Sequence, residues 1–147
     1  MDQTPAIMMR AIGSVCGGRV EPVDDSWDEI EAEIALDPVQ IGVDATAGLD
    51  QFSHIEVVYS FNLVPETSIE TGARHPRGRP AWPKVGILAQ RGKSRPNRIG
   101  VTVCRLLSVD RLRLRVQRLD AIDGTPVLDI KPVMAGFLPR GAVREPD

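Results

Sequence analysis

The sequence predicts a mainly β, mostly antiparallel protein with short helical turns. In "RLRLRVQRL", Leu112, Leu114 and Val116 alternate strictly with arginines, which is the period of a strand buried on one face. Other runs rich in β-branched residues recur along the chain, each bounded by Gly, Pro or Asn, whereas long helical patterns are missing. A chain of 147 residues is most simply one domain, covering residues 1–147.

The first elements of the chain include one ambiguous segment. "SWDEIEAEIALDP" (residues 26–38) fits a helix capped by Ser26, but its apolar residues also alternate with glutamates. We favour a strand that ends at Asp37, because a residue before proline avoids helical geometry. A short helical turn is expected within residues 39–48, followed by a strand in "HIEVVYSFNLV" (residues 54–64).

The second half alternates strands with irregular segments. Residues 67–83 contain five Gly and Pro residues among arginines and are expected to form an exposed, mobile loop. Further strands are predicted in "KVGILAQ" (84–90), "IGVTVCRLL" (99–107) and "TPVLDIK" (125–131). The tail after residue 131 is interrupted by Pro and Gly, and we expect it to lie over the folded domain or a partner subunit.

Composition excludes several classes of protein. No apolar run approaches the roughly 20 residues that span a bilayer, and the N-terminus lacks the pattern of a leader, so we expect a cytoplasmic protein. Cys16 and Cys104 lack metal-ligand spacing, which favours free thiols and no metal site. Phosphate-binding glycine motifs are absent. Ser53 and His54 are adjacent and would point to opposite faces of a strand, which argues against a nucleophile and its base.

The charge is divided unevenly along the chain. Residues 1–70 hold 14 acids and 2 bases, whereas residues 71–147 hold 16 bases and 6 acids. The two halves could neutralise each other within the fold or across a dimer. Alternatively, residues 71–109, which carry nine bases and no acid, form a surface for a polyanion such as RNA.

The loop "RGKSRPNRIG" (residues 91–100) is predicted to present its arginines rigidly. Pro96 fixes its own backbone and keeps Arg95 extended, and Asn97 tolerates left-handed geometry. Guanidinium groups aimed by the backbone suit carboxylates and phosphates. We therefore interpret this loop as functional.

A group of carboxylates in "LDAIDGTPVLDIKP" (residues 119–132) is the second candidate site. Asp123 and Gly124 predict a tight turn, and the strand that follows places Asp129 and Lys131 on one face. Asp120 and Asp123 flank an apolar pair at the end of the alternating strand. A solvated turn and a ligand site both fit this pattern.

Three segments in this order resemble the TrmO/YaeB family, also called TsaA-like or VirR-like. They are "GLDQFSHI", "RGKSRPNRIG" and "LDAIDGTPVLDIKP". The resemblance implies a small antiparallel β-barrel that forms homodimers and binds S-adenosylmethionine near the subunit interface. It also implies methylation of the exocyclic nitrogen of threonylcarbamoyl-adenosine beside the tRNA anticodon. We expect this chain to lack the additional C-terminal domain of bacterial members, because its sequence ends at Asp147.

The resemblance also assigns residues to the site. Its cofactor contacts fall on Asn62, Leu63, Arg91, Val101, Gln117, Arg118, Leu119 and Asp120. We expect Asp120 or Asp123 to orient the amine or accept its proton, and hence to be catalytic. The expected nucleic-acid contacts are Arg74, Arg77, Arg79, Lys93, Arg95 and Arg98. Two alternatives remain, a non-catalytic dimeric module that binds S-adenosylmethionine and a methyltransferase for a small metabolite.

Overall fold

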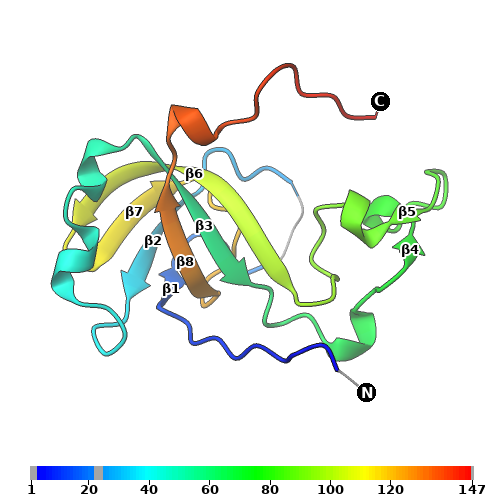
Figure 1. The fold of residues 1–147 in the computed structure, drawn as a ribbon, viewed down its shortest axis with the longest axis horizontal. Helices are drawn as coiled ribbons and strands as arrows, with labels where there is room; N and C mark the ends of the chain where they lie inside the picture. Colours follow the sequence, from blue (N-terminus) through cyan, green and yellow to red (C-terminus); the bar gives the residue numbers. More distant parts are fainter. Residues whose placement is uncertain (1–2, 22–24, 147) are drawn as a thin grey trace.

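The computed structural model describes residues 3–21 and 25–146, and its centre is a closed antiparallel barrel (Figure 1). The strand order around the barrel is β1-β2-β7-β6-β3-β8. The strands are β1 (Gly13–Cys16), β2 (Glu31–Leu36), β3 (His54–Ser60), β6 (Ile99–Asp110), β7 (Arg113–Gln117) and β8 (Pro126–Pro132). The predicted mainly β, mostly antiparallel fold is therefore confirmed, and so is the barrel implied by the family resemblance.

Alternating side chains explain why these segments form a barrel. In β7, Leu114 and Val116 are fully buried while Arg113 and Arg115 face solvent, as the sequence predicts. In β2, alternate residues are buried in the same way, and residues Glu31 to Ala35 pair with β7. The strand interpretation of this segment is therefore confirmed over residues 31–36. A helix would have placed acidic residues on a face that this barrel buries.

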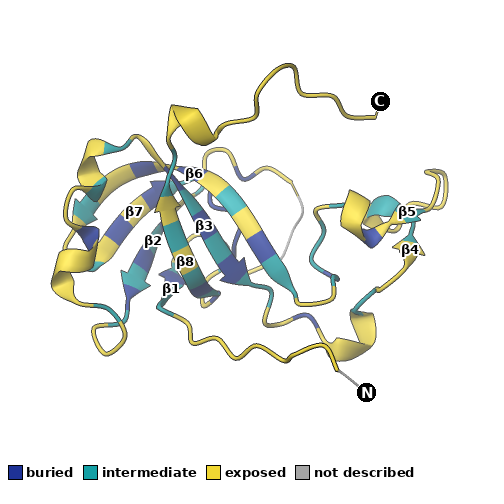
Figure 2. Ribbon diagram, viewed as in Figure 1, coloured by how far each residue is buried: buried dark blue, intermediate teal, exposed yellow. Residues whose placement is uncertain are grey.

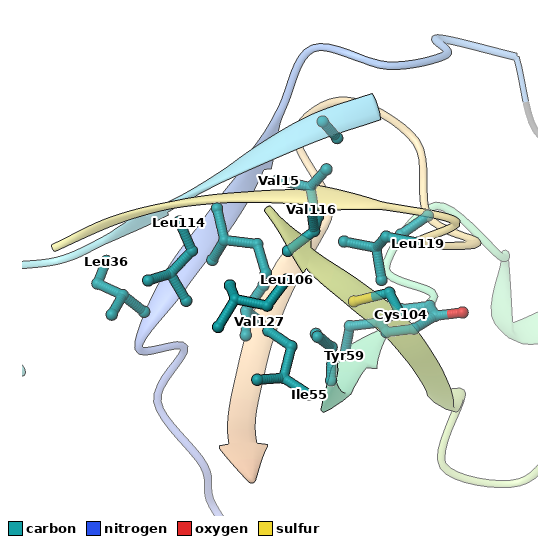
Figure 3. Packing of buried hydrophobic residues seen from close by; sticks show 14 residues of the cluster. Val15, Leu36, Ile55, Tyr59, Cys104, Leu106, Leu114, Val116, Leu119 and Val127 are labelled. Atoms are coloured by element: carbon teal, nitrogen blue, oxygen red, sulfur yellow. The ribbon is translucent and has the colours of Figure 1, made fainter. Parts of the chain in front are cut away.

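The core fills the barrel and is built from both ends of the sequence. Val15, Ile55, Leu114 and Val127 lie within it, each at most 1% exposed. Figure 2 shows that burial is concentrated in the barrel strands, and Figure 3 shows their side chains packed together. Cys104 is a buried free thiol, and burial raises its pKa to about 12, so it acts as an apolar core residue.

Strand β6 is longer than its neighbours and is paired unevenly. Its whole first half pairs with β3, but β7 reaches only as far as Arg105 of β6. A register shift between Leu106 and Ser108 bends the β6–β7 hairpin, which turns at Arg111 with a left-handed φ of 54°. The edge of residues 99–104 that faces away from β3 is consequently left for loops to cover.

Residues 61–98 leave the barrel and form a lobe that we call the basic lobe. In Figure 1 it projects beyond the end of β3. It holds the two-stranded sheet of β4 (Ala73–Arg74) and β5 (Val85–Gly86). It also holds the short 3-10 turns η3 (Glu66–Ser68), η4 (Pro76–Gly78) and η5 (Ile87–Ala89). Most of the lobe is exposed (Figure 2), because it has few apolar residues to bury.

Several predicted boundaries need correction. The strand expected over residues 84–90 is limited to β5, because the chain turns into η5 directly afterwards. The strand expected over residues 54–64 ends at Ser60. A turn follows, in which Val64 N–H donates a 3.1 Å hydrogen bond to the carbonyl of Phe61. The helical turn expected within residues 39–48 is found as η1 (Val43–Thr46).

Two further turns complete the fold. Turn η2 (Leu49–Gln51) precedes β3, and η6 (Ala135–Phe137) follows β8. Residues 138–146 are exposed and lead away from the barrel in Figure 1. Across the described residues, no helix is both long and apolar enough to cross a membrane.

Candidate functional site

Two adjoining hollows lie at the end of the barrel where β3 ends and β6 and β8 begin. The first, which we call the apolar hollow, has a volume of about 250 Å³. Its walls come from the end of β3, the start of the basic lobe, the loop before β6 and the segment after β7. The lining includes Tyr59, Phe61, Leu63, Val64, Ala121 and Ile122. It is suited to a flat, apolar ring.

The second, which we call the polar hollow, has a volume of about 460 Å³. It lies beside the part of β6 that β7 does not reach, and its lining carries opposite charges. Asp25, Asp28 and Asp120 face it, as do Arg91 and Arg118. Such a surface suits a ligand that carries both an anionic and a cationic group.

The two hollows share three lining residues, Trp27, Arg91 and Asp120. They come from the loop before β2, the loop before β6 and the segment after β7. A ligand that extends from one hollow to the other must pass these residues. The shared wall is therefore the position from which side chains can act on both compartments.

Arg91 is held in the shared wall by the open edge of β6. Its Nη2 donates a 3.0 Å hydrogen bond to the carbonyl of Val101, which pairs only with β3. The same bond satisfies the carbonyl and fixes the guanidinium. Val101 and Val103 are 37% and 44% exposed on the outer face of this strand.

Trp27 is the aromatic part of the shared wall, and it is only 7% exposed. The guanidinium of Arg19 lies 4.8 Å from the centre of its ring. Arg19 also donates a 2.7 Å hydrogen bond to the carbonyl of Asp25, which lies two residues before Trp27. These contacts hold the indole in place against the hollows.

Tyr59 closes the inner end of the apolar hollow. Its hydroxyl donates a 2.6 Å hydrogen bond to the carbonyl of Asp120 and lies 3.0 Å from Oγ1 of Thr102. Its ring meets Phe61 edge to face, with centroids 5.3 Å apart. Gly100 makes room for both rings, because a Cβ there would lie 2.5 Å from the Tyr59 ring and 2.8 Å from Phe61.

The residues expected to contact a cofactor are mostly brought together. Asn62, Leu63, Arg91 and Asp120 line the apolar hollow, and Val101 and Arg118 line the polar hollow with Arg91 and Asp120. Gln117 and Leu119 line neither hollow. Leu119 is 1% exposed in the core, because its side chain points into the barrel, and Gln117 pairs with β2 and β6.

The two aspartates expected to be catalytic occupy different places. Asp120 lies in the shared wall. Asp123 lines neither hollow, and its Oδ1 accepts a 2.8 Å hydrogen bond from Gly17 N–H. Gly124 N–H also donates to the carbonyl of Val15 at 2.7 Å. The turn at Asp123 therefore connects β8 to the loop after β1, which is a structural role.

Three of the expected nucleic-acid contacts bind their own chain. Arg95 donates to the carbonyl of Gln90 at 2.7 Å, and Arg98 donates to that of Val64 at 2.8 Å. Arg77 forms a 2.6 Å ion pair with Asp25, which lines the polar hollow. Arg95 and Arg98 thus hold the loop of residues 91–100. Its left-handed residue is Arg98, with φ 52°, where the sequence suggested Asn97.

The other three basic residues have different surroundings. Arg79 lies over the ring of Trp82, 4.9 Å from its centre. Lys93 lines the apolar hollow. The Nε of Arg74 is buried and has no hydrogen-bond partner among the described residues. Some basic side chains of this lobe therefore bind their own chain, whereas Lys93 lies at the site.

The expectation that Ser53 and His54 point to opposite faces is wrong. Ser53 Oγ and His54 Nδ1 lie 2.7 Å apart, because Ser53 precedes β3 and does not follow the alternation of the strand. Both side chains are exposed, and neither lines the two hollows. The pair is a local hydrogen bond at the opposite end of β3.

Sequence reasoning missed Trp27 and Tyr59 as residues of the site. In the helix considered for residues 26–38, Trp27 would lie on the apolar stripe, and Tyr59 is one of several apolar residues in the strand expected over residues 54–64. The signal that could have found Tyr59 is a hydroxyl on a core-facing position, since a buried hydroxyl needs a partner. Trp27 offers no comparable local signal.

The fold and the site define a closed antiparallel β-barrel with two binding hollows at one end. Residues 22–137 match the family model described as "tRNA-methyltransferase O N-terminal domain". The chain therefore belongs to the TrmO family.

Relatives in several organisms agree with this assignment. A Methanothermobacter thermautotrophicus protein named "Probable S-adenosyl-L-methionine-binding protein" is 38% identical over 76% of this chain and 75% of its own. The human "tRNA (adenine(37)-N6)-methyltransferase" is 37% identical over 67% of this chain and 22% of its own. The chain thus spans only about a fifth of the human enzyme.

Solved structures share the whole fold. The crystal structure of TrmO from Pseudomonas aeruginosa superposes with a TM-score of 0.78 and 26% sequence identity. The match covers 98% of this chain and 62% of that protein. The barrel and the basic lobe are therefore the shared part of a longer protein in that relative.

Proposed function

We propose that this chain is an S-adenosylmethionine-dependent methyltransferase that methylates the exocyclic nitrogen of threonylcarbamoyl-adenosine beside the tRNA anticodon. One observation carries the proposal: two hollows of different polarity share Arg91 and Asp120. S-adenosylmethionine has an apolar ring at one end and a charged amino acid at the other, so it would extend through both hollows and pass the residues that they share. The name of the archaeal relative supports the donor, and the name of the human relative supports the N6 of a tRNA adenine as the acceptor.

The residues of the two hollows fit the parts of S-adenosylmethionine. The apolar hollow, with the rings of Tyr59 and Phe61, suits the adenine. The polar hollow offers Arg91 and Arg118 to a carboxylate and Asp25 and Asp28 to an ammonium group, which leaves Asp120 for the acceptor. When bound, S-adenosylmethionine supplies an electrophilic methyl on a sulfonium, which leaves as a neutral thioether.

The remaining tasks fall to residues of the chain. We assign Asp120 to orient the acceptor amine and to take the proton that its nitrogen loses. Arg91, held by the carbonyl of Val101, fixes the donor beside that carboxylate. Asp123 is not required for the chemistry in this proposal, because it braces a turn.

The basic lobe is proposed as the contact for the tRNA backbone. We assign the phosphate contacts to Lys93, which lines the apolar hollow, and to Arg79. Binding by such contacts weakens steeply with added salt. We further propose that two copies pair through the outer face of β6, where Val101 and Val103 are exposed beside the polar hollow. The proposed place of action is the cytoplasm.

A second candidate is a non-catalytic module that binds S-adenosylmethionine. It is favoured by the printed name of the archaeal relative, which mentions binding and no reaction. Methylation of a small metabolite would use the same hollows without the basic lobe. Both alternatives predict no transfer of methyl groups to RNA.

Calorimetric titration with S-adenosylmethionine tests the donor site first. Replacing Arg91 with Ala removes a charged hydrogen-bond donor and should weaken binding about tenfold or more. Arg115→Ala, on the exposed face of β7 and outside the lining of both hollows, is the matched control and should bind like wild type. No saturable binding by the wild-type protein would contradict the proposal.

Transfer of a labelled methyl group then separates the three functions. Labelled threonylcarbamoylated tRNA and no label on the unmodified tRNA support the proposed acceptor. Binding of the donor without transfer to either RNA supports the binding module. Label that appears only on a small molecule from a cell extract supports the metabolite methyltransferase.

A further inference from the structure

We infer that Tyr59 is a positioning residue for methyl transfer, which holds the main chain at Asp120 through its hydroxyl. This inference rests on the proposed function of Asp120. Tyr59 lies near the end of β3, points inward and is 2% exposed. Figure 3 shows its ring beside Cys104, with the hydroxyl at the edge of the core cluster.

The hydrogen bonds around this hydroxyl have a single possible direction. The carbonyl of Asp120, 2.6 Å away, can only accept, so Tyr59 donates its one proton there. Thr102 Oγ1, 3.0 Å away, must then donate to the phenol oxygen. Burial raises the pKa of Tyr59 to about 12, so the phenol keeps this proton at neutral pH.

The same three residues lie where the two hollows meet. Tyr59 lines the apolar hollow, Thr102 lines the polar hollow and Asp120 lines both. The hydroxyl chain therefore runs across the junction and ends on the residue that we assign as the proton acceptor. A shift of the Asp120 main chain would move its carboxylate relative to donor and acceptor together.

The residues on either side of Asp120 are fixed, so the hydrogen bond to its carbonyl affects the orientation of this one peptide. Leu119 and Ala121 are anchored in the core on either side, and Arg118 turns the chain with a left-handed φ of 73°. Between these anchors, the carbonyl of Asp120 accepts the 2.6 Å hydrogen bond from Tyr59. Losing that bond removes a fixed contact from the peptide that carries the carboxylate.

The Tyr59 ring itself is fixed by packing and does not depend on its hydroxyl. Gly100 lies against one side, where an added Cβ would approach the ring to 2.5 Å, and Phe61 packs against it edge to face. Tyr59→Phe therefore removes the hydroxyl and leaves the ring in its place. This makes the substitution a clean test of the bond.

The first experiment compares Tyr59→Phe with wild type. We expect amide exchange in residues 118–122 to accelerate about tenfold, the equivalent of one typical hydrogen bond, with strands β2 and β7 unchanged. We expect kcat to fall about tenfold or more, with KM for S-adenosylmethionine changed less than about threefold. Unchanged exchange and unchanged kcat would overturn the inference.

Thr46→Val is the matched control. Thr46 is also buried, and its hydroxyl donates a 2.8 Å hydrogen bond to the carbonyl of Arg111 at the other end of the barrel. It loses the same kind of bond as Tyr59→Phe, so it corrects for general destabilisation. An equal loss of kcat in Thr46→Val would show that the effect is not positional and would overturn the inference.

A double-mutant cycle separates positioning from an independent role. If Tyr59 acts through Asp120, Tyr59→Phe should change kcat less than about threefold in an Asp120→Asn background. A full tenfold loss in that background would mean that Tyr59 acts on something else. A wild-type protein that methylates neither RNA would refute the proposed function, and the exchange measurement would still decide whether the hydroxyl holds residues 118–122.

Discussion

The apolar and polar hollows adjoin each other, but they are held by different forces. The apolar hollow is framed by the rings of Tyr59 and Phe61, which pack closely against Gly100 and the core. The polar hollow is walled in part by exposed ion pairs, Arg77 with Asp25 and Arg118 with Asp28. The side chains of all four ion-paired residues are 44% exposed or more.

This difference indicates which hollow has a fixed shape. Close packing resists any change of volume, because neighbouring groups have no free space to occupy. Exposed ion pairs exchange readily with water and salt and contribute little to stability. We therefore expect the apolar hollow to be preformed and the wall of the polar hollow to adjust when a charged ligand enters.

The largest expected effect comes from filling the space beside Tyr59. Gly100→Ala places a methyl group 2.5 Å from the ring, which must move into the apolar hollow. We expect a loss of about 1–3 kcal/mol in the free energy of unfolding, as in other overpacked cores, and loss of binding to S-adenosylmethionine. Urea unfolding and calorimetry measure the two effects.

Gly42→Ala is the control for this substitution. A Cβ at Gly42 meets nothing within 4 Å, and its φ of −73° suits alanine. It should unfold and bind like wild type. If Gly100→Ala also bound normally, the apolar hollow would be as adjustable as the polar one, and the comparison would fail.

Alkaline pH should lower the free energy of unfolding through Tyr59 and Cys104. The effect should be smaller than that of Gly100→Ala and larger than that of a change in the wall of the polar hollow. Burial raises the pKa of Tyr59 from 10.0 to about 12 and that of Cys104 from 9.0 to about 12. The folded state therefore holds protons that the unfolded state loses first, so stability is full below pH 9.0 and declines as pH rises toward about 12.

Urea unfolding midpoints measured across this range test the alkaline decline. Cys104→Ala should lower stability at every pH but flatten the decline, since one of the two titrating groups is removed. A decline of the same steepness in this variant would show that Cys104 does not contribute to it.

The smallest effect is expected at the wall of the polar hollow. Asp25→Asn removes the ion pair with Arg77, which holds the pKa of the Asp25 carboxyl below its usual range through a hydrogen bond and charge attraction. Because both partners are exposed, the urea midpoint should stay within error of wild type at neutral pH. A marked drop in the midpoint would show that this ion pair is structural and that the polar hollow is rigid.

Local patterns were sufficient for much of the barrel. The apolar and polar residues alternate in β7 and in residues 31–36 of β2, and this alternation alone predicts a strand with one buried face. The prediction does not depend on which strand lies beside it. The strand predicted over residues 84–90 was too long, because the apolar residues there follow no period that distinguishes a strand from a turn. Ile87 is buried at the start of η5, so its apolar character was real while its predicted conformation was wrong.

The site was predictable where the sequence motifs supply the residues and not where distant segments meet. Arg91 and Asp120 were expected from the motifs, and both lie in the shared wall. Trp27 reaches that wall only because barrel closure brings its loop beside them. Similarly, the partner of the Tyr59 hydroxyl lies 61 residues away in the sequence, beyond the range of any local pattern.

Barrel closure also sets the moment at which the site can first exist. Strand β1 pairs with β8, and the turn before β8 is tied to the loop after β1 through Asp123 and Gly17. The hollows draw on segments from Asp25 to Thr125, so a ribosome-bound chain lacks them until most of the protein has emerged. Contacts of such long range form slowly and late in folding. The methyl donor can consequently stabilise only finished molecules, and its binding would serve as a direct reporter of completed folding.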